Sequence, residues 1–390
     1  MHFKIASYPG RGNPNNPYVD LFYNALEPHG VTLAGELEFN IDWLKDHSEQ
    51  LNAIHVHWPE IFWREYTPFK ENSNPIRSFI RTKFPAGWRL IKLTDQLTAH
   101  PSYQKRLALV NKIKGYFYFR KFLAKTHQAG LRIIWTFHNA ETHEGSDFID
   151  HLGYKYLAKS ADLIIFHSEI AQNDFLKHHQ LKGQAVLMPH GNYDGVYPPE
   201  RPKETILKEL GLRDDLPIVS CIGMLRSYKG LDTAVQAISL LEGEVQFLCA
   251  GYPHPSFDIT SLQEQIAKLP NAVLIPKFLS NQEFSDYTSI SDCLLMPYKK
   301  ITGSGALLAA LTLSRGVITS DLPYFREILA NHPDAGTLVP DGNPQLLANS
   351  IKQYLAIPAI KRNQAARSLA EDYNWDKVIP PVANIINSLN

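Results

Sequence analysis

Short apolar runs alternate with longer amphipathic stretches along most of the chain. This alternation is typical of βαβ units, in which helices connect the strands of a parallel sheet. Helical stretches lie at 232–241, 261–268 and 343–355, among others. The runs that predict strands cover residues 3–7, 53–57, 132–137, 163–167, 185–188, 218–222, 245–250, 273–275, 293–297 and 316–320. The pattern therefore predicts an α/β protein with parallel sheets.

Turn-forming residues interrupt this alternation at 191–203, and a new series of strands and helices starts near residue 216. We therefore expect two Rossmann-like, doubly wound domains, at 1–195 and 196–372. A C-terminal helix at 373–390 is expected to pack back on the first domain. Open parallel sheets bind ligands at the carboxyl ends of their strands, so the expected ligand site is a cleft between the two sheets.

The charge balance and the cysteines restrict the class of protein. Basic and acidic residues each number 39, so the net charge is zero. Cys221, Cys249 and Cys293 lie in apolar strand-like runs without metal-ligand spacing, which indicates reduced thiols in a cytoplasmic protein. The first residues enter a strand-like run directly, and no long uncharged apolar segment occurs. We therefore expect neither a signal peptide nor a membrane-spanning helix.

A first motif suited to a nucleotide diphosphate lies at 223–232, after a predicted strand and at the start of a helix. Arg226 can fork onto phosphate oxygens, and Lys229 can act as a point charge. Such charges offset a diphosphate in a partly dry cleft. The structural alternative, a solvated turn between a strand and a helix, is equally compatible with this motif alone.

Two further motifs follow predicted strands in the same half. Small residues at Ser304, Gly305 and Ala306 let backbone N–H groups approach an anion at the start of an apolar helix. Glu327 is suited to accept hydrogen bonds from ribose hydroxyls. The alternatives are a tight turn before a core helix and a helix-start acid stabilised by the helix dipole.

In order and spacing, these three motifs resemble the donor-binding domain of GT-B glycosyltransferases, in particular family 4 and its relatives. The resemblance covers about 215–330 and extends more loosely to the whole chain. The closing Tyr373-Asn374-Trp375-Asp376 is similar to the start of the family's last helix. The resemblance implies that the second domain binds a nucleotide-sugar donor and the first binds the acceptor.

Two acids that family 4 usually carries are missing from this chain. The position before the Gly-rich loop is Ile301 or Thr302, and the one in the next helix is Ala309 or Ala310. The segments Gly-x-Leu-Arg-x-Tyr-Lys-Gly and Ser-Gly-Ala-Leu-Leu are similar instead to bacterial exopolysaccharide enzymes, including inverting β-mannosyltransferases. The resemblance thus implies an inverting transfer, in which Glu327 or backbone groups hold the ribose.

Two motifs of the first half, 54–60 and 135–144, also resemble segments of these enzymes. Direct inversion needs a general base near the acceptor hydroxyl. The candidates are Glu144, His143 and Glu60, whereas His138 is expected to contact the donor sugar or phosphate, although it is also a candidate catalytic residue.

The histidines of these motifs have two other interpretations. At least one of His55 and His57 is expected to pack inside the sheet layer. Together with His138 and His143, they also suggest a metal site. GT-B enzymes usually offset diphosphate charge with side chains and helix dipoles, so we expect neither a metal nor another cofactor.

Gly12 and His190 are assigned to the donor side by the same resemblance. Gly12 lies in a loop at 10–18 that looks like the flexible glycine loop of many GT-B enzymes. The spacing of this loop does not fit a dinucleotide fingerprint. His190 lies in a Pro-His-Gly segment similar to the hinge of these enzymes, and a role in hinge packing is equally compatible.

Residues 77–125 contain twelve lysines and arginines, one acid, and interleaved aromatic residues. Such a segment can be a solvated face, a nucleic-acid site or a contact with an anionic bilayer. The neutral chain and the lack of a known module disfavour nucleic acid. We expect the membrane contact, with Trp88, Tyr116 and Phe117 at the interface, because a polyprenyl-linked acceptor would lie there.

The sequence therefore predicts a hexosyltransferase that uses a GDP- or UDP-linked sugar and a lipid-linked or saccharide acceptor. It would act in exopolysaccharide or cell-surface glycan synthesis, as a peripheral protein at the inner face of the cell membrane. A sugar-nucleotide epimerase on the same fold is one alternative, and it would need no lipid acceptor. A non-catalytic assembly subunit is the other, although Arg226, Lys229 and Glu327 argue against it.

Overall fold

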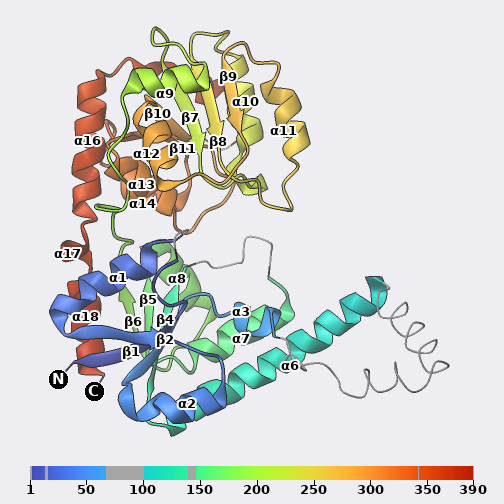
Figure 1. Ribbon diagram of the computed structural model, residues 1–390, viewed down its shortest axis with the longest axis vertical. Helices are drawn as coiled ribbons and strands as arrows, with labels where there is room; N and C mark the ends of the chain where they lie inside the picture. The colour runs from blue at the N-terminus through green and yellow to red at the C-terminus, as the bar shows by residue number, and fades with distance from the viewer. Residues whose placement is uncertain (1, 14–15, 67–100, 139–145, 341, 390) are drawn as a thin grey trace, which may run out of the picture.

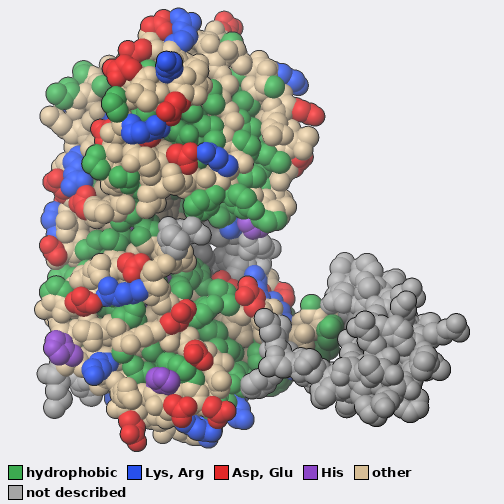
Figure 2. Space-filling view, in the orientation of Figure 1, with side chains coloured by type: hydrophobic (Ala, Val, Ile, Leu, Met, Phe, Trp, Pro, Cys, Tyr) green, Lys and Arg blue, Asp and Glu red, His purple; other side chains and the backbone are tan. Residues whose placement is uncertain are grey.

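Two parallel six-stranded sheets, each in its own domain, form the protein (Figure 1). The computed structural model describes residues 2–13, 16–66, 101–138, 146–340 and 342–389, with side chains from residue 106 onward in the third range. Basic and acidic side chains are interspersed over both domains in the view of Figure 2. The α/β class and the parallel sheets expected from the pattern are confirmed.

The first sheet has the strand order β2-β1-β3-β4-β5-β6. Its strands are β1 (Phe3–Tyr8), β2 (Val31–Glu36), β3 (Ala53–Val56), β4 (Arg132–Phe137), β5 (Leu163–Phe166) and β6 (Gln184–Leu187). The helices of this half are α1 (Tyr18–Leu26), α2 (Ile41–His47), α3 (Ile61–Arg64), α6 (Pro101–Gln128), α7 (Phe148–Ala158) and α8 (Glu169–His178). Short 3-10 turns at Glu27–His29 and Ser48–Gln50 precede β2 and β3.

The second sheet has the order β12-β11-β10-β7-β8-β9. Its strands are β7 (Ile218–Ile222), β8 (Gln246–Ala250), β9 (Ala272–Ile275), β10 (Cys293–Met296), β11 (Val317–Ser320) and β12 (Gly336–Val339). Its helices are α9 (Lys203–Leu210), η3 (Ser227–Lys229), α10 (Leu231–Ser239), α11 (Ile259–Ile266), α12 (Asn281–Ser289), α13 (Gly305–Thr312), α14 (Pro323–Leu329), α15 (Pro344–Leu355) and α16 (Ala359–Asp372). The chain ends with α17 (Trp375–Val378) and α18 (Pro380–Ser388).

All ten strands expected from the apolar runs are present, but the pattern missed β2 and β12. Both lie at the edge of their sheets. The second half of β2 is exposed, and its register with β1 shifts between Ile5 and Ala6. β2 contains Thr32, Gly35 and Glu36, and β12 begins with Gly336 and Thr337, so neither has the continuous apolar run by which the other strands were found.

Helices cover both faces of each sheet, which explains why the central strands are apolar throughout. On one face of the first sheet, Trp63 and Phe119 pack into a core with α7 and α8. On the other face, Phe22 of α1 lies in one cluster with Ile379 and Ile386 from the end of the chain. The last helix, α18, therefore lies on the first domain, as Figure 1 shows.

The chain passes between the domains twice, and the two passages are bonded to each other. Asn192 N donates to Tyr373 O at 2.7 Å, and Trp375 Nε1 donates to Asn192 O at 2.9 Å. A Cβ on Gly191 would lie 2.2 Å from the Trp375 ring. Only glycine therefore fits here, and the turn-rich segment and the Tyr-Asn-Trp-Asp segment form one joint.

The buried carboxylate of Asp150 ties α3 and α6 to α7. It accepts from Trp63 Nε1 at 2.8 Å and pairs with Arg64 at 2.6 Å and Lys112 at 2.8 Å. Burial alone would raise the pKa of Asp150, but the hydrogen bonds from Arg64, Lys112 and Trp63 hold it well below its usual value. This cluster fixes the root of α6, whose other end runs out beyond the first sheet (Figure 1).

Candidate active site

The carboxyl ends of the two sheets face each other across the space between the domains. Ser168, directly after β5, donates through Oγ to Thr302 O in the loop before α13, at 3.2 Å. The carbonyl oxygen of His138, directly after β4, lies 3.8 Å from where a Cβ on Gly303 would be. The motifs of the two halves therefore meet where parallel sheets bind ligands.

Lys229 is the best defined feature of the donor side. Its residue is 8% exposed, and its Nζ lies 5.5 Å from the centre of the Tyr298 ring. Burial lowers the pKa of Lys229 to about 8, and the neighbouring Arg226 also lowers it. No carboxylate pairs with this ammonium among the residues that the structure describes. A buried cation without a carboxylate suits an anionic ligand.

The backbone holds Lys229 in place through a tight glycine turn. Gly230 has φ of 63°, and a Cβ there would lie 1.9 Å from Pro297 O. A side chain is therefore excluded, and the loop after β7 is held against the end of β10. Gly230 also begins α10, which the sequence predicts from the apolar positions after it.

Arg226 precedes Lys229 in the same loop, with an extended backbone. Its residue is half-buried, and its Nε lies 3.0 Å from Met224 Sδ. Two basic side chains thus lie three positions apart in one strand-to-helix loop, as the motif predicts.

The start of α13 supplies backbone donors in the same domain. Ser304 is the N-cap, and its Oγ accepts from Leu307 N at 3.2 Å. The N–H groups of Gly305 and Ala306 precede the first intrahelical bond, so they are available to an anion. A Cβ on Gly305 would lie 2.3 Å from Tyr193 Oη, which explains the glycine. The Ser304 hydroxyl itself is used to cap the N-terminus of α13.

Glu327 lies at the domain boundary, but it already has partners. Its Oε1 accepts from Glu169 N at 2.9 Å, and its Oε2 accepts from Ile170 N at 3.5 Å. This carboxylate of α14 therefore caps the first turn of α8 across the domain boundary. The expected ribose contact would replace these bonds, and it stays a prediction.

On the acceptor side, four imidazoles surround the buried ring of Tyr18 at the start of α1. The ring centroids of His57, His138, His167 and His190 lie 4.9–5.6 Å from that of Tyr18. Burial is the main cause that lowers the pKa of each, to about 3 for His167 and about 4 for His190. The four rings are therefore neutral at physiological pH and form a polar, uncharged cluster around Tyr18.

His57 orients His138 within this cluster of histidines. His57 Nδ1 lies 3.1 Å from His138 Nε2, and Trp58 stacks on the His138 ring at 4.5 Å. The Nε2 atoms of His57 and His167 have no hydrogen-bond partner among the described residues. His138 is thus fixed on two sides, next to nitrogens that are available to a ligand.

His55 has a structural role, which confirms that at least one histidine of this pair packs inside the sheet. Its Nδ1 lies 2.8 Å from Tyr23 Oη, and its Nε2 lies 2.8 Å from Thr136 Oγ1. Both ring nitrogens are thus used inside the first domain.

Glu60 and His138 line one small cavity together with Trp58 and Tyr154. Tyr154 Oη donates to Glu60 Oε2 at 3.1 Å. Burial raises the pKa of Glu60, although the hydrogen bond from Tyr154 opposes this shift. The structure therefore brings together two of the four candidate catalytic residues.

The remaining predicted residues lie in different surroundings. His143 and Glu144 lie outside the described residues. His190 Nδ1 lies 2.7 Å from Gly191 O, beside the joint between the domains. Gly12 is exposed, has φ of 83° and donates to Asp20 at 3.1 Å. The glycine loop thus rests on α1 through this bond.

Sequence reasoning missed Tyr18 and His167. His167 ends a predicted strand, as His57 and His138 nearly do, so its position after a buried run was a usable signal. Tyr18 carries no such signal, because only the tertiary packing of α1 brings it among the histidines.

The described part of the chain contains neither a recognisable metal site nor a membrane-spanning helix. No three histidines, cysteines or acids there are arranged to hold a metal ion. Over the same residues, no helix combines the length and apolarity needed to cross a bilayer.

Comparisons with known proteins agree with this architecture. Residues 202–371 match the family described as glycosyl transferases group 1. The chain is 23% identical over 251 residues to the alpha-maltose-1-phosphate synthase of Mycolicibacterium smegmatis, covering 60% of this chain. The match spans 64% of that relative, less than two thirds of its length.

Two solved structures are similar over nearly their whole length. Sucrose-phosphate synthase from Thermosynechococcus elongatus has a TM-score of 0.68 at 16% identity, covering 100% of this chain and 99% of that one. Anabaena HepE in complex with UDP and glucose has a TM-score of 0.69 at 13% identity, covering 99% and 100%.

The fold and the cleft therefore define a two-domain GT-B protein, as the sequence predicts. Within this class, the second domain is a glycosyl transferases group 1 domain. The glycosyltransferase assignment is thereby made for this domain.

Proposed function

We propose that this protein transfers a hexose from a nucleotide-diphosphate sugar to a saccharide or lipid-linked acceptor. The observation that carries the proposal is the buried Lys229, for which the described residues supply no carboxylate partner. A diphosphate would supply the missing negative charge. The family match and the complexes of HepE with UDP and with UDP-glucose support a UDP- or GDP-linked donor.

In the proposed reaction, an acceptor hydroxyl oxygen attacks the anomeric carbon of the donor sugar. The new C–O bond forms as the bond between that carbon and the phosphate oxygen breaks, and the nucleoside diphosphate leaves with the electron pair. Lys229, Arg226 and the amides of Gly305 and Ala306 offset the charge that grows on the diphosphate. No metal ion is required for this role, and we expect turnover to survive chelation.

The hydroxyl proton goes to a base on the first domain. Glu60 and His138 line one cavity; burial raises the pKa of Glu60 and lowers that of His138, so the His138 ring is unprotonated and able to accept a proton. His143 and Glu144 remain candidates. We propose inversion, because the two acids of family 4 are replaced by Ile301 or Thr302 and by Ala309 or Ala310.

We further propose that the acceptor is lipid-linked and that α6 lies on the inner face of the cell membrane, in exopolysaccharide or cell-surface glycan synthesis. Support comes from apolar side chains exposed on α6, including Leu109 at 52% and Phe117 at 58%. Arg106, Lys114 and Lys121 are exposed on the same helix. Apolar and basic side chains on one helix suit an anionic interface.

Lys229→Ala tests the proposed donor site. Loss of a buried charge-assisted contact to the leaving group is expected to lower kcat/KM by about 100-fold or more. The melting temperature should not fall, because Lys229 is buried without a carboxylate partner in the described part. Donor turnover with a sugar acceptor is measured together with UDP and GDP affinity.

Lys352→Ala is the matched control, since Lys352 of α15 pairs with the exposed Glu244. Its activity should equal that of the unmodified protein. Nearly intact turnover by Lys229→Ala would overturn the proposed site. Conversion of the donor alone to an isomeric sugar nucleotide would indicate an epimerase, and tight nucleotide binding without transfer would indicate an assembly subunit.

A further inference from the structure

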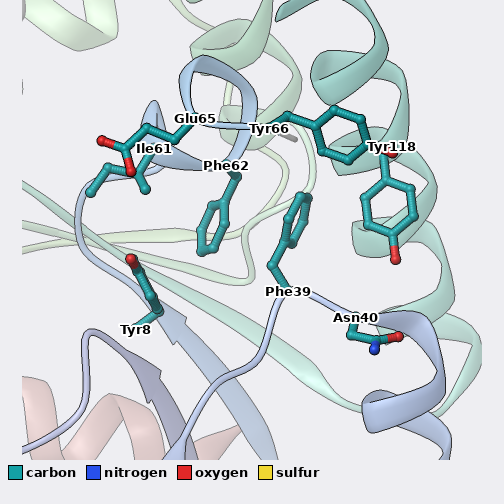
Figure 3. Close-up of a pocket in the computed structure, with 8 residues that line it drawn as sticks. All are labelled: Tyr8, Phe39, Asn40, Ile61, Phe62, Glu65, Tyr66 and Tyr118. Carbon is teal, nitrogen blue, oxygen red and sulfur yellow. The ribbon is translucent and has the colours of Figure 1, made fainter. Parts of the chain in front are cut away.

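An aromatic pocket of about 330 Å³ opens in the first domain, beside the site described above. This volume lies in the range of small-molecule sites. The pocket is built where β1 and β2 end and where α3 meets α6 (Figure 3). The transfer chemistry proposed above uses none of its residues.

Five rings form a continuous wall in this pocket. Tyr8 contacts Phe62 at 5.1 Å between ring centroids, and Phe62 contacts Phe39 at 4.5 Å. Phe39 in turn contacts Tyr118 at 5.1 Å, and Tyr118 contacts Tyr66 at 5.5 Å. Figure 3 shows Tyr8 on one side of the phenylalanines and the two other tyrosines on the opposite side, beside α6.

Polar groups stand at the edge of the wall. Glu65 is exposed at the end of α3, and Figure 3 shows its carboxylate on the same side as Tyr8. Burial raises the pKa of Tyr8, and the charge of Glu65 also raises it, so the Tyr8 hydroxyl stays a hydrogen-bond donor. The pocket thus combines flat apolar faces with hydroxyls and one carboxylate.

The pocket adjoins the proposed acceptor side through a short stretch of chain. His57 N donates to Tyr8 O at 3.2 Å, and the next residue, Trp58, stacks on His138. Glu60 and Phe62 are two residues apart, and they line the small cavity and the aromatic pocket respectively. A molecule in the pocket therefore lies next to Glu60, one of the candidate bases.

We infer that this pocket binds a neutral pyranose ring of the acceptor. The inference rests on the proposed function. The C–H face of a pyranose is apolar and flat enough to lie on aromatic rings, and its hydroxyls can bond Glu65 and Tyr8. The negative charge of Glu65 disfavours a uronate or a diphosphate, because like charges at short range repel. A prenyl chain would cover the Tyr8 hydroxyl and offer it no hydrogen-bond partner.

Saturation-transfer NMR with the UDP-bound full chain tests this inference. Cellobiose, maltose and lactose serve as neutral probes, and cellobiouronic acid and farnesol serve as the charged and the lipid probe. We expect transfer to at least one neutral sugar and none to the other two. Tyr66→Ala should weaken sugar binding by about tenfold through loss of one ring.

Tyr66→Phe keeps the ring and should retain binding, and Tyr252→Ala, at an exposed tyrosine of the second domain, is the matched control. Glu65→Gln should admit cellobiouronic acid. Equal sugar binding by Tyr66→Ala, binding of farnesol alone, or no sugar binding at all would overturn the inference. UDP affinity is measured in every sample, so a failed donor site is recognised separately from a failed pocket.

Discussion

Lys229 should couple donor binding to pH. Burial lowers its pKa to about 8 in the free protein, whereas a bound diphosphate favours the ammonium form. Above about pH 8, binding therefore requires proton uptake, and the Kd of UDP should rise by up to about tenfold per pH unit. Calorimetry in two buffers of different ionisation enthalpy measures both the affinity and the proton uptake.

Two variants, and the direction in which stability changes with pH, separate this effect from a general pH response. Lys229→Ala should bind UDP weakly with no such slope, whereas Lys352→Ala should keep it. The free protein should become more stable from about pH 8 upward, because the unfolded chain still binds the proton that folded Lys229 has lost. A flat affinity profile for the unmodified protein would contradict the assignment.

Residues whose role follows from their place after a strand were predictable from the sequence. Lys229 and His138 both follow apolar runs, and each lies in a loop at the carboxyl end of a strand of its own sheet. The partners of Glu327 were not predictable, since they lie 157 and 158 positions away and donate through backbone N–H groups. A sequence pattern carries no information on such a contact, because any residue type supplies the donor.

Helix α6 should attach the protein to anionic bilayers. Leu109 and Phe117 are exposed, whereas Lys112 is bonded to Asp147 and Asp150 and holds the root of the helix. Replacing Leu109 and Phe117 together by aspartate removes apolar contact and adds repulsion. We expect at least about tenfold weaker co-sedimentation with phosphatidylglycerol vesicles.

The control is Leu346→Asp, at a leucine that is 39% exposed on α15. It should sediment like the unmodified protein, and vesicles of phosphatidylcholine alone should bind neither variant nor parent well. Equal sedimentation of the α6 double variant and the parent would show that this helix is not the attachment.

The local sequence pattern predicted some strands and turns better than others. Central strands were predictable because a parallel sheet buries both faces, so each strand is a continuous apolar run. The edge strands β2 and β12 were not, since glycine and polar residues interrupt that signal. The turn-rich segment after β6 was recognised, but its bonding to Tyr373 and Trp375 depends on two passages that meet only in the folded chain.

The relative position of the two domains depends on few contacts on the α8 side of the cleft. Ser168 Oγ donates to Thr302 O, and Glu327 accepts from Glu169 N and Ile170 N. On the opposite side, the double passage of the chain through Asn192 acts as the joint. Such an arrangement permits a hinge motion about the joint, opposed by the α8 contacts.

Glu327→Ala should therefore open the cleft of the free protein. Glu327 is exposed, so we assign its two cross-domain bonds only about 1 kcal/mol, which corresponds to roughly a fivefold shift toward open forms. Small-angle scattering should give a larger radius of gyration for this variant than for the parent, with UDP reducing the difference. Glu264→Ala, at an exposed glutamate of α11, should leave the radius unchanged. An unchanged radius together with lost UDP affinity would instead assign Glu327 to the ribose, and the domain contact would then have no energetic role.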